Sequence, residues 1–295
     1  MREGPQLAFK PEDRQRTLAS RLRRGSGFPL HCFAPSGRWT VSPSATSDRG
    51  SRLTVWDGLD QSGPFITPSL LACDFGRMRD VLDRIARIGV QAVHLDVMDG
   101  RFVPNLTYGP PVIARWREAT HLVFDAHLMI VEPERWIDPF ADAGCDTLVV
   151  HLEAVEQPGP VLERIKARGL RAGIAVNPPT LLRLDPVPSW LALLDSALVM
   201  SVMPGFGGQV FDPSVLSKVA ALKQARPGLR VAIDGGIGPD TLAAAVATGV
   251  DQLVIGSAFF RADDQLEVAW SDLNQRLRQV NPSPLLGTRR RTDPL

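Results

Sequence analysis

Eight short apolar runs, each rich in β-branched residues, recur along the central part of this 295-residue chain and limit what it can fold into. Helical patterns separate several of them, as at 75–88 and 213–225, and a glycine often precedes the next run. Strands alternating with helices over about 215 residues are typical of a single (β/α)8 TIM barrel, a fold of the α/β class. The expected strands are Ile66–Leu71, Val90–Val97, Leu122–Leu128, Thr147–His151, Arg171–Val176, Ala197–Val202, Arg230–Asp234 and Gln252–Ile255.

An open, doubly wound sheet is the competing α/β solution. That fold usually has fewer strands and carries a glycine-rich phosphate fingerprint after its first strand. Residues 66–75 lack such a fingerprint, so the pattern favours the barrel.

The two ends of the chain differ from this regular centre. Residues 1–65 are rich in Arg, Ser, Gly and Pro, and apart from a short helix expected around Glu12–Arg24 they show little apolar periodicity. We interpret them as a flexible extension, or as residues upstream of the true start codon, with an organelle transit peptide as a weaker alternative. Residues 281–295 are expected to form a flexible tail, which leaves residues 66–280 as the catalytic barrel.

Composition narrows the range of partners and compartments. A formal net charge of +1 gives no reason to expect nucleic acid or an anionic membrane as a partner. No apolar run reaches the length of a transmembrane helix, and residues 1–65 contain no apolar signal-peptide segment. The three cysteines form no C-x-x-C pair, which fits a reducing compartment such as the cytoplasm.

Polar side chains stand where several of these strands end, and this is where a TIM barrel carries its functional groups. His94 and Asp96 are two residues apart, so on a strand they face the same side. With His127 and Asp234 they supply two imidazoles and two carboxylates, a set that suits one divalent ion: Zn²⁺, Fe²⁺, Mn²⁺ or Co²⁺. His151 ends the fourth strand and is interpreted as a supporting or wall residue.

Glycines cluster after the last three strands. In the segment Gly205-Phe206-Gly207-Gly208, and in Gly235-Gly236 and Gly256-Ser257, the backbone can approach an anion closely. Barrels often build a phosphate site from these loops and a helix start, which Gly238-Pro239-Asp240-Thr241 offers here. The pattern therefore predicts a phosphorylated small-molecule substrate. Met98, Met129 and Met200 also fall at strand ends and are expected to form a supporting wall.

These motifs together make the chain similar to the ribulose-phosphate 3-epimerase family, from about residue 66 to residue 277. The motifs that carry the resemblance are Pro68-Ser69-Leu70-Leu71, His94-x-Asp96-x-Met98-Asp99-Gly100-x-Phe102-Val103-Pro104-Asn105, His127-Leu128-Met129, Asn177-Pro178, Pro204-Gly205-Phe206-Gly207-Gly208-Gln209, Asp234-Gly235-Gly236 and Gly256-Ser257-Ala258.

The resemblance implies metal-dependent interconversion of D-ribulose 5-phosphate and D-xylulose 5-phosphate by a homo-oligomer. It implies that His94, Asp96, His127 and Asp234 bind the metal, and that Asp96 and Asp234 are the two acid–base groups. Ser69 and the two histidines would contact the substrate, and the glycine loops with Ser257 would hold its phosphate. Inversion at C3 needs a proton removed from one face and returned to the other, which suits two carboxylates on opposite sides.

Three alternatives stay open at this point. An epimerase of a six-carbon ketose phosphate such as allulose 6-phosphate shares these motifs. A decarboxylase of the orotidine-phosphate type shares the phosphate loops, but it would need a lysine among its catalytic acids, and none lies near Asp96. A barrel that only binds sugar phosphates would not need both Asp96 and Asp234. Met203 and Cys73 depart from residues common in the family, where Asn or Glu and Ala are frequent, and bear on fine substrate preference only.

Overall fold

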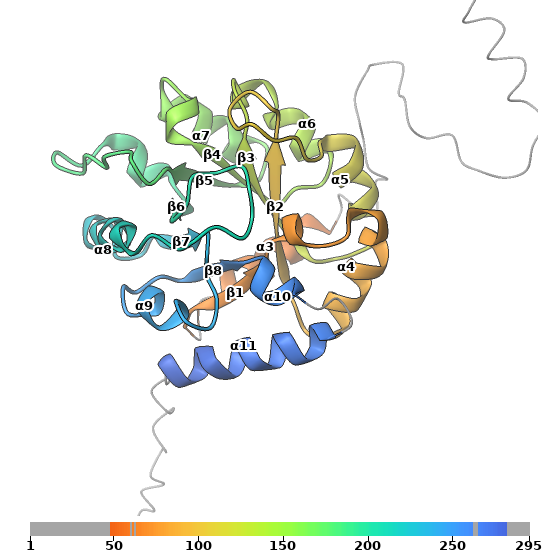
Figure 1. Cartoon of the computed structure of the whole chain (residues 1–295). Coiled ribbons are helices and arrows are strands. Elements are labelled where there is room, and N and C mark those ends of the chain that lie inside the picture. Colours follow the sequence, from red (N-terminus) through yellow and green to blue (C-terminus); the bar gives the residue numbers. More distant parts are fainter. Residues whose placement is uncertain (1–47, 60, 62, 262–264, 282–295) are drawn as a thin grey trace, which may run out of the picture. The chain divides into compact units, whose positions relative to one another are not determined.

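The computed structural model describes residues 48–59, 61, 63–261 and 265–281, and it shows the predicted TIM barrel (Figure 1). Eight parallel strands follow one another in the order β1-β8-β7-β6-β5-β4-β3-β2. A bridge between Ser69 and His94 joins the end of β1 to β2 and brings the two edges of the sheet together. The strands are β1 Phe65–Pro68, β2 Ala92–Met98, β3 Val123–Met129, β4 Thr147–His151, β5 Arg171–Val176, β6 Ser196–Met200, β7 Arg230–Asp234 and β8 Gln252–Ile255.

Helices surround these strands, as Figure 1 shows. Among the described segments, no helix is both long enough and apolar enough to cross a bilayer. The α-helices are α3 Arg49–Gly58, α4 Met78–Arg87, α5 Pro110–Arg117, α6 Ile137–Asp142, α7 Pro158–Ala167, α8 Leu216–Ala225, α9 Leu242–Val246, α10 Ser257–Phe260 and α11 Leu266–Val280.

The predicted strands are all present, and β4, β5, β7 and β8 have the expected bounds. The first strand is shorter than expected because the chain turns at Ser69, whose side chain accepts a hydrogen bond from the Leu71 N–H. The helical patterns at 75–88 and 213–225 each begin as a 3₁₀ turn and continue as α4 and α8.

Side chains alternate between two environments along each strand. In β2, Val93, Leu95 and Val97 belong to the large core cluster between strands and helices. His94 and Asp96 alternate with them and so face the inside of the barrel. A small cluster of buried apolar side chains also fills part of the interior: Val149, Ala175, Leu198, Met200, Ala232 and Val254. The barrel is therefore a packed core with polar groups at one end.

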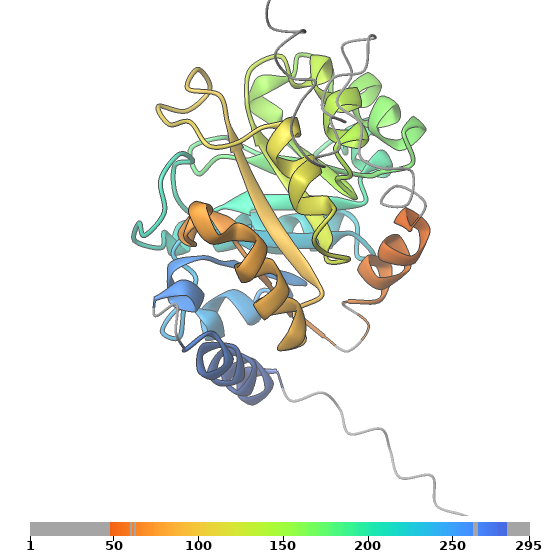
Figure 2. The ribbon, with the colours of Figure 1, turned by 90° about the vertical axis from the view of Figure 1, so that its right-hand side faces the viewer.

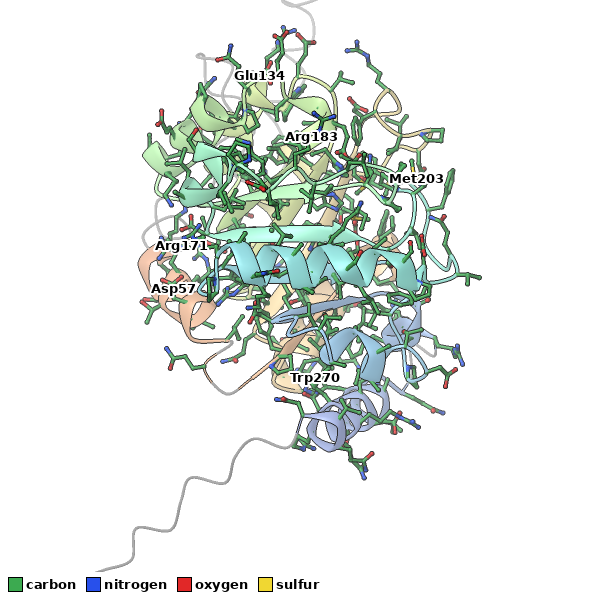
Figure 3. All side chains as sticks on the ribbon, turned by 90° about the vertical axis from the view of Figure 1, so that its left-hand side faces the viewer. Asp57, Glu134, Arg171, Arg183, Met203 and Trp270 are labelled. Carbon is green, nitrogen blue, oxygen red and sulfur yellow. The ribbon has the colours of Figure 1, made fainter. Side chains whose placement is uncertain are left out.

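The expectation of a flexible extension up to residue 65 is wrong for residues 49–58, which form α3. Trp56 is only 1% exposed and packs against Ala92 and Val123, the first residues of β2 and β3. Figure 2 shows the helix α3, coloured orange-red, beside the barrel. Asp57 pairs with Arg171 at the start of β5 (Figure 3). Arg52 and Trp56, four residues apart, form the buried face of this helix. A spacing that rests on two residues is a weak indication of a helix, and the polar composition of the segment made it hard to recognise. The helix expected at 12–24, the rest of the extension up to residue 47, and residues 282–295 lie outside the described part of the chain.

A buried carboxylate anchors α3 to the barrel. Asp146, just before β4, accepts hydrogen bonds from Arg52 Nε at 2.9 Å and Arg117 Nη1 at 3.0 Å. It also accepts the backbone N–H of Phe124 at 3.0 Å. Because the Asp146 side chain is fully buried, its charge depends on these donors in place of water.

We expect Arg52→Ala to lower the free energy of unfolding by about 3 kcal/mol, because it removes one of two cations from a buried carboxylate. Urea denaturation of the full chain measures this change. Arg87→Ala, which breaks an exposed pair with Asp83, is the control and should have a much smaller effect. Equal stability of the two variants would show that α3 does not depend on Asp146.

Candidate active site and metal centre

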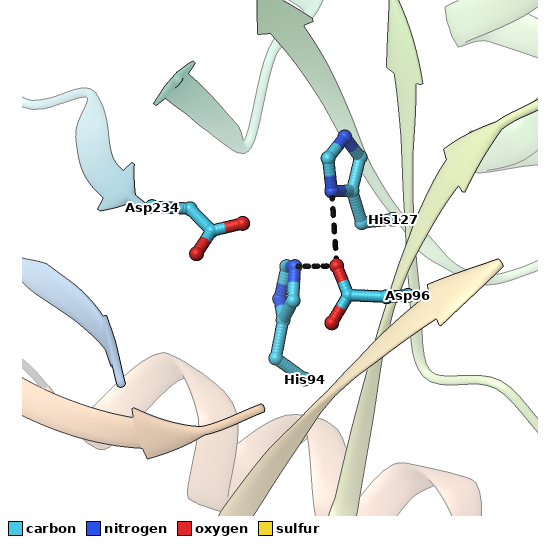
Figure 4. A group of neighbouring side chains, drawn as sticks. All are labelled: His94, Asp96, His127 and Asp234. Carbon is cyan, nitrogen blue, oxygen red and sulfur yellow. Dashed lines mark ion pairs between the residues drawn. The ribbon is translucent and has the colours of Figure 1, made fainter. Parts of the chain in front are cut away.

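The four predicted metal ligands meet at the carboxyl ends of their strands. His94 and Asp96 come from β2, His127 from β3 and Asp234 from β7, and Figure 4 shows Asp234 reaching toward the other three. One ligand-capable atom from each residue lies within 4.8 Å of those of the others. The barrel topology thus gathers residues up to 140 positions apart, as the pattern of strand ends predicts.

Asp96 lies at the centre of this group. Its Oδ2 atom accepts a hydrogen bond from Ser69 Oγ at 2.6 Å. Its Oδ1 atom lies 3.7 Å from His94 Nε2 and 3.6 Å from His127 Nδ1. These last distances are too long for hydrogen bonds, so both nitrogens face the carboxylate without bonding to it.

The two ring nitrogens of His94 face different carboxylates, Nδ1 that of Asp125 and Nε2 that of Asp96. His94 Nδ1 lies 3.1 Å from Asp125 Oδ2, and an ionised carboxylate can only accept. Nδ1 therefore carries a hydrogen, and Nε2 is a buried atom with no hydrogen-bond partner. In neutral His94, the form that binds a metal, Nε2 presents a lone pair. Asp125 is held in turn by Thr147 Oγ1 and by Gln252 Nε2, the latter at 2.8 Å.

His127 has the same arrangement through a different neighbour. Its Nε2 atom lies 2.8 Å from His151 Nε2, while its Nδ1 atom is buried and has no hydrogen-bond partner. His151 Nδ1 contacts Glu153 Oε2 at 3.1 Å, and the Phe102 ring packs on the imidazole with centroids 4.6 Å apart. The structure thus places His151 behind a candidate ligand.

Sequence reasoning missed Asp125 and Glu153. Asp125 stands two residues before His127, so it faces the same side of β3, and that spacing could have identified it. Glu153 follows β4 in a short 3₁₀ turn, where no strand periodicity applies.

The charges of the site are arranged asymmetrically. Burial, reinforced by the negative charge of Asp96, raises the pKa of Asp234 to about 7. Burial also acts on Asp96, but the neighbouring His94 charge and the hydrogen bond from Ser69 help to lower its pKa below the usual value. Burial opposes charge on His94, yet Asp96 and Asp125 raise its pKa to about 9. Without a metal this imidazole is therefore protonated, and metal binding would displace the hydrogen from Nε2. For His127, burial lowers the pKa to about 4. Without a metal, Asp96 is the ionised carboxylate of the pair and Asp234 is the one that holds a proton.

A pocket opens above this cluster, and most of the predicted substrate residues line it. His94 and His127 do not, because both are completely buried beneath it. The predicted residues on its wall are Ser69, Asp96, Met98, Met129, Met200, Gly205, Phe206, Gly207, Gly208, Asp234, Gly235, Gly236, Gly256 and Ser257.

Two glycines after β7 are required by close packing. At Gly235 the φ angle is 110°, and a Cβ atom would lie 2.6 Å from Val202 Cγ2. At Gly236 the φ angle is 60°, and a Cβ atom would lie 2.6 Å from the backbone nitrogen of Phe211. Side chains are therefore excluded where the loops after β6 and β7 meet, which leaves backbone facing the pocket.

The loop after β2 joins the glycine loop after β6. Asn105 Nδ2 donates to the Gly205 carbonyl at 2.7 Å, and Val103 packs with Met98 and Met129. Two loops from opposite sides of the barrel thus meet over the carboxylates.

Fold and pocket together define an α/β-barrel enzyme with its site at the carboxyl ends of the strands. Residues 65–260 match the model of the ribulose-phosphate 3 epimerase family. The chain belongs to the ribulose-phosphate 3-epimerase family and is therefore an isomerase of the epimerase class.

Individual relatives agree with this assignment. The ribulose-phosphate 3-epimerase of Mycobacterium tuberculosis is 47% identical over 206 residues, which cover 68% of this chain and 88% of the relative. The cytoplasmic isoform of the enzyme from Oryza sativa subsp. japonica is 39% identical over 210 residues, covering 69% and 90%. A solved structure of 3-keto-L-gulonate-6-phosphate decarboxylase from Vibrio cholerae shares the fold, with a TM-score of 0.56 and 14% identity, covering 74% of this chain and 98% of that one.

The protonated state of Asp234 predicts a pH dependence for the metal-free protein. Folded protein keeps this proton up to about pH 7, whereas the unfolded chain releases it near pH 3.8. Stability therefore falls as pH rises between these values, by up to about 1.4 kcal/mol per pH unit, because the folded state binds more protons. Asp234→Asn cannot lose a proton and lacks this term.

Urea denaturation of chelator-treated wild type and Asp234→Asn at pH 4 to 8 measures the difference. The variant should gain stability relative to wild type from about pH 4 to about pH 7. Parallel pH profiles would mean that Asp234 ionises at an ordinary pKa.

Proposed function

We propose that this protein interconverts D-ribulose 5-phosphate and D-xylulose 5-phosphate by proton transfer at C3, with one bound divalent cation. The observation that carries the proposal is the convergence of two buried imidazole nitrogens without hydrogen-bond partners and two carboxylates at the floor of one pocket. The family membership supports the reaction class, and the relatives are named for the five-carbon substrate.

The residues present fit a divalent cation. His94 Nε2 and His127 Nδ1 are buried, unpaired, and directed at the same oxygen of Asp96. A bound cation would displace the Nε2 hydrogen of His94, so that two nitrogen lone pairs and a carboxylate oxygen would face one point. His94, Asp96, His127 and Asp234 would hold it, and mixed nitrogen and oxygen donors accept Zn²⁺, Fe²⁺, Mn²⁺ or Co²⁺. When bound, the cation supplies stabilisation of the negative charge that develops on the substrate oxygens.

Asp96 and Asp234 divide the proton chemistry between them. They come from β2 and β7 and approach the centre from different sides (Figure 4). The carboxylate of Asp96 accepts the C3 proton from one face of the sugar, and the acid form of Asp234 donates a proton to the other. In the reverse direction the roles exchange. The Ser69 hydroxyl keeps Asp96 oriented through its 2.6 Å hydrogen bond.

The rest of the pocket positions the sugar. Backbone groups of Gly205 to Gly208, Gly235, Gly236 and Gly256, with Ser257, would hold the phosphate, and Phe206 would lie beside it. Binding there fixes C3 relative to the carboxylates without taking part in the reaction. Met98, Met129 and Met200 line the pocket as an apolar wall that limits the access of water.

Turnover in D₂O tests the two-base scheme. D-xylulose 5-phosphate formed from D-ribulose 5-phosphate should carry deuterium at C3. We expect Asp96→Asn and Asp234→Asn each to lower kcat/KM by at least about 10³-fold, because each removes one proton-transfer group. Asp83→Asn, a change in an exposed ion pair, is the control. Near-normal turnover of Asp234→Asn would contradict the scheme.

The same assay separates the five-carbon substrate from allulose 6-phosphate. A higher kcat/KM for D-ribulose 5-phosphate supports the proposal, and a higher value for the six-carbon substrate overturns the substrate assignment.

We also propose that the protein is a homo-oligomer located in the cytoplasm. Leu106 and Trp136 are 72% and 45% exposed beside a groove between the loop after β2 and α6, and a second copy could cover them. The named cytoplasmic isoform of rice supports the location. Sedimentation of the full chain and fractionation of the source cells test the two statements.

A further inference from the structure

A chain of hydrogen bonds runs from the surface to His127. Glu153 Oε2 contacts His151 Nδ1 at 3.1 Å, and His151 Nε2 contacts His127 Nε2 at 2.8 Å. The His151 side chain is completely buried, whereas that of Glu153 is 23% exposed. Neither residue belongs to the group of metal-capable side chains.

The donors and acceptors along this chain allow only one direction. An ionised carboxylate has no hydrogen to give, so His151 Nδ1 must donate to Glu153. A neutral His151 then presents a lone pair at Nε2, and His127 Nε2 must donate to it. His127 Nδ1 is consequently left without a hydrogen, and this is the buried atom without a hydrogen-bond partner that faces Asp96.

We propose that Glu153 and His151 are positioning residues that hold His127 in its Nε2–H form and direct its Nδ1 lone pair at the cation. This inference rests on the metal site proposed above. Asp125 fixes the Nδ1–H form of neutral His94 in a single step, through one carboxylate. The two imidazoles of the site are therefore set by separate outer partners, and the longer chain belongs to His127.

Several contacts fix the outer end of the chain. Glu153 Oε1 accepts the backbone N–H of Asn177 at 2.8 Å and also the hydroxyl of Thr180. Lys218 Nζ donates to the carbonyls of Asn177 and Pro178, both at 2.7 Å. Because its carboxylate is held from the loop after β5, Glu153 can orient His151 at little further entropic cost.

Co²⁺ titration of the metal-free full chain, in competition with a chelator, tests the inference without a substrate. His151→Phe keeps a ring but offers His127 no acceptor, and Glu153→Leu removes the acceptor for His151. We expect each to weaken Co²⁺ binding about 10- to 100-fold and to change the visible absorption of the bound ion. His151→Gln, whose amide oxygen can accept from His127, should restore most of the affinity. Glu156→Gln, at an exposed carboxylate in the same loop, is the control.

The outcomes separate this inference from the metal site itself. Wild-type protein that binds no Co²⁺ would overturn both. Wild-type binding that His151→Phe and Glu153→Leu leave unchanged, with the same absorption spectrum, would overturn the positioning role alone.

A second measurement requires no variant to fold. Long-range ¹H–¹⁵N spectra of the imidazoles in metal-free wild-type protein distinguish the two neutral forms of histidine. The Nε2–H form of His127 supports the proposal, and the Nδ1–H form, with its hydrogen directed at Asp96, overturns it.

Discussion

The buried carboxylate of Asp96 is the group around which the site is organised. Two imidazole nitrogens face its Oδ1 atom at 3.6 and 3.7 Å, and both are buried without a hydrogen-bond partner. Buried carboxylates in a low-dielectric interior need a positive charge close by. Protonated His94 supplies this charge without a metal, and a bound cation would supply it in its place. The raised pKa of Asp234, caused by burial and by Asp96, is a second consequence of the same crowding. The crowding of buried groups around Asp96 thus explains both why the site fits a cation and why Asp96 and Asp234 differ in pKa.

The barrel crowds buried polar groups together at the carboxyl ends of its strands. At the opposite end, by contrast, a buried charge is neutralised by nearby side chains. There Asp146 is also buried, but arginines from α3 and α5 supply its counter-charges. The contrast is instructive. At that end Asp146 has two permanent partners, which connect α3 and α5 to the start of β4. At the carboxyl ends of the strands two buried imidazole nitrogens are left without hydrogen-bond partners, which is the condition expected where a ligand completes the site.

The repeated strand pattern, together with the rule that a TIM barrel carries its polar functional groups at the ends of its strands, was enough to predict the fold and the four residues of the cluster. His94 and Asp96 share a face because they are two residues apart, and β3 and β7 bring His127 and Asp234 to the same end of the barrel. Periodicity could not predict Glu153 or the chain through His151, since a 3₁₀ turn places the carboxylate. It also missed α3, because the partners of Arg52 and Trp56 lie far along the chain, at Ala92, Val123 and Asp146.

The number of divalent ions that the full chain binds, measured together with turnover of D-ribulose 5-phosphate, tests the central claim most directly. Metal-free protein prepared with a chelator would be titrated with Zn²⁺, Mn²⁺, Fe²⁺ or Co²⁺. The account predicts that activity is absent without metal and rises in proportion to occupancy until one ion is bound per chain. Full turnover by protein shown to contain no metal would contradict it.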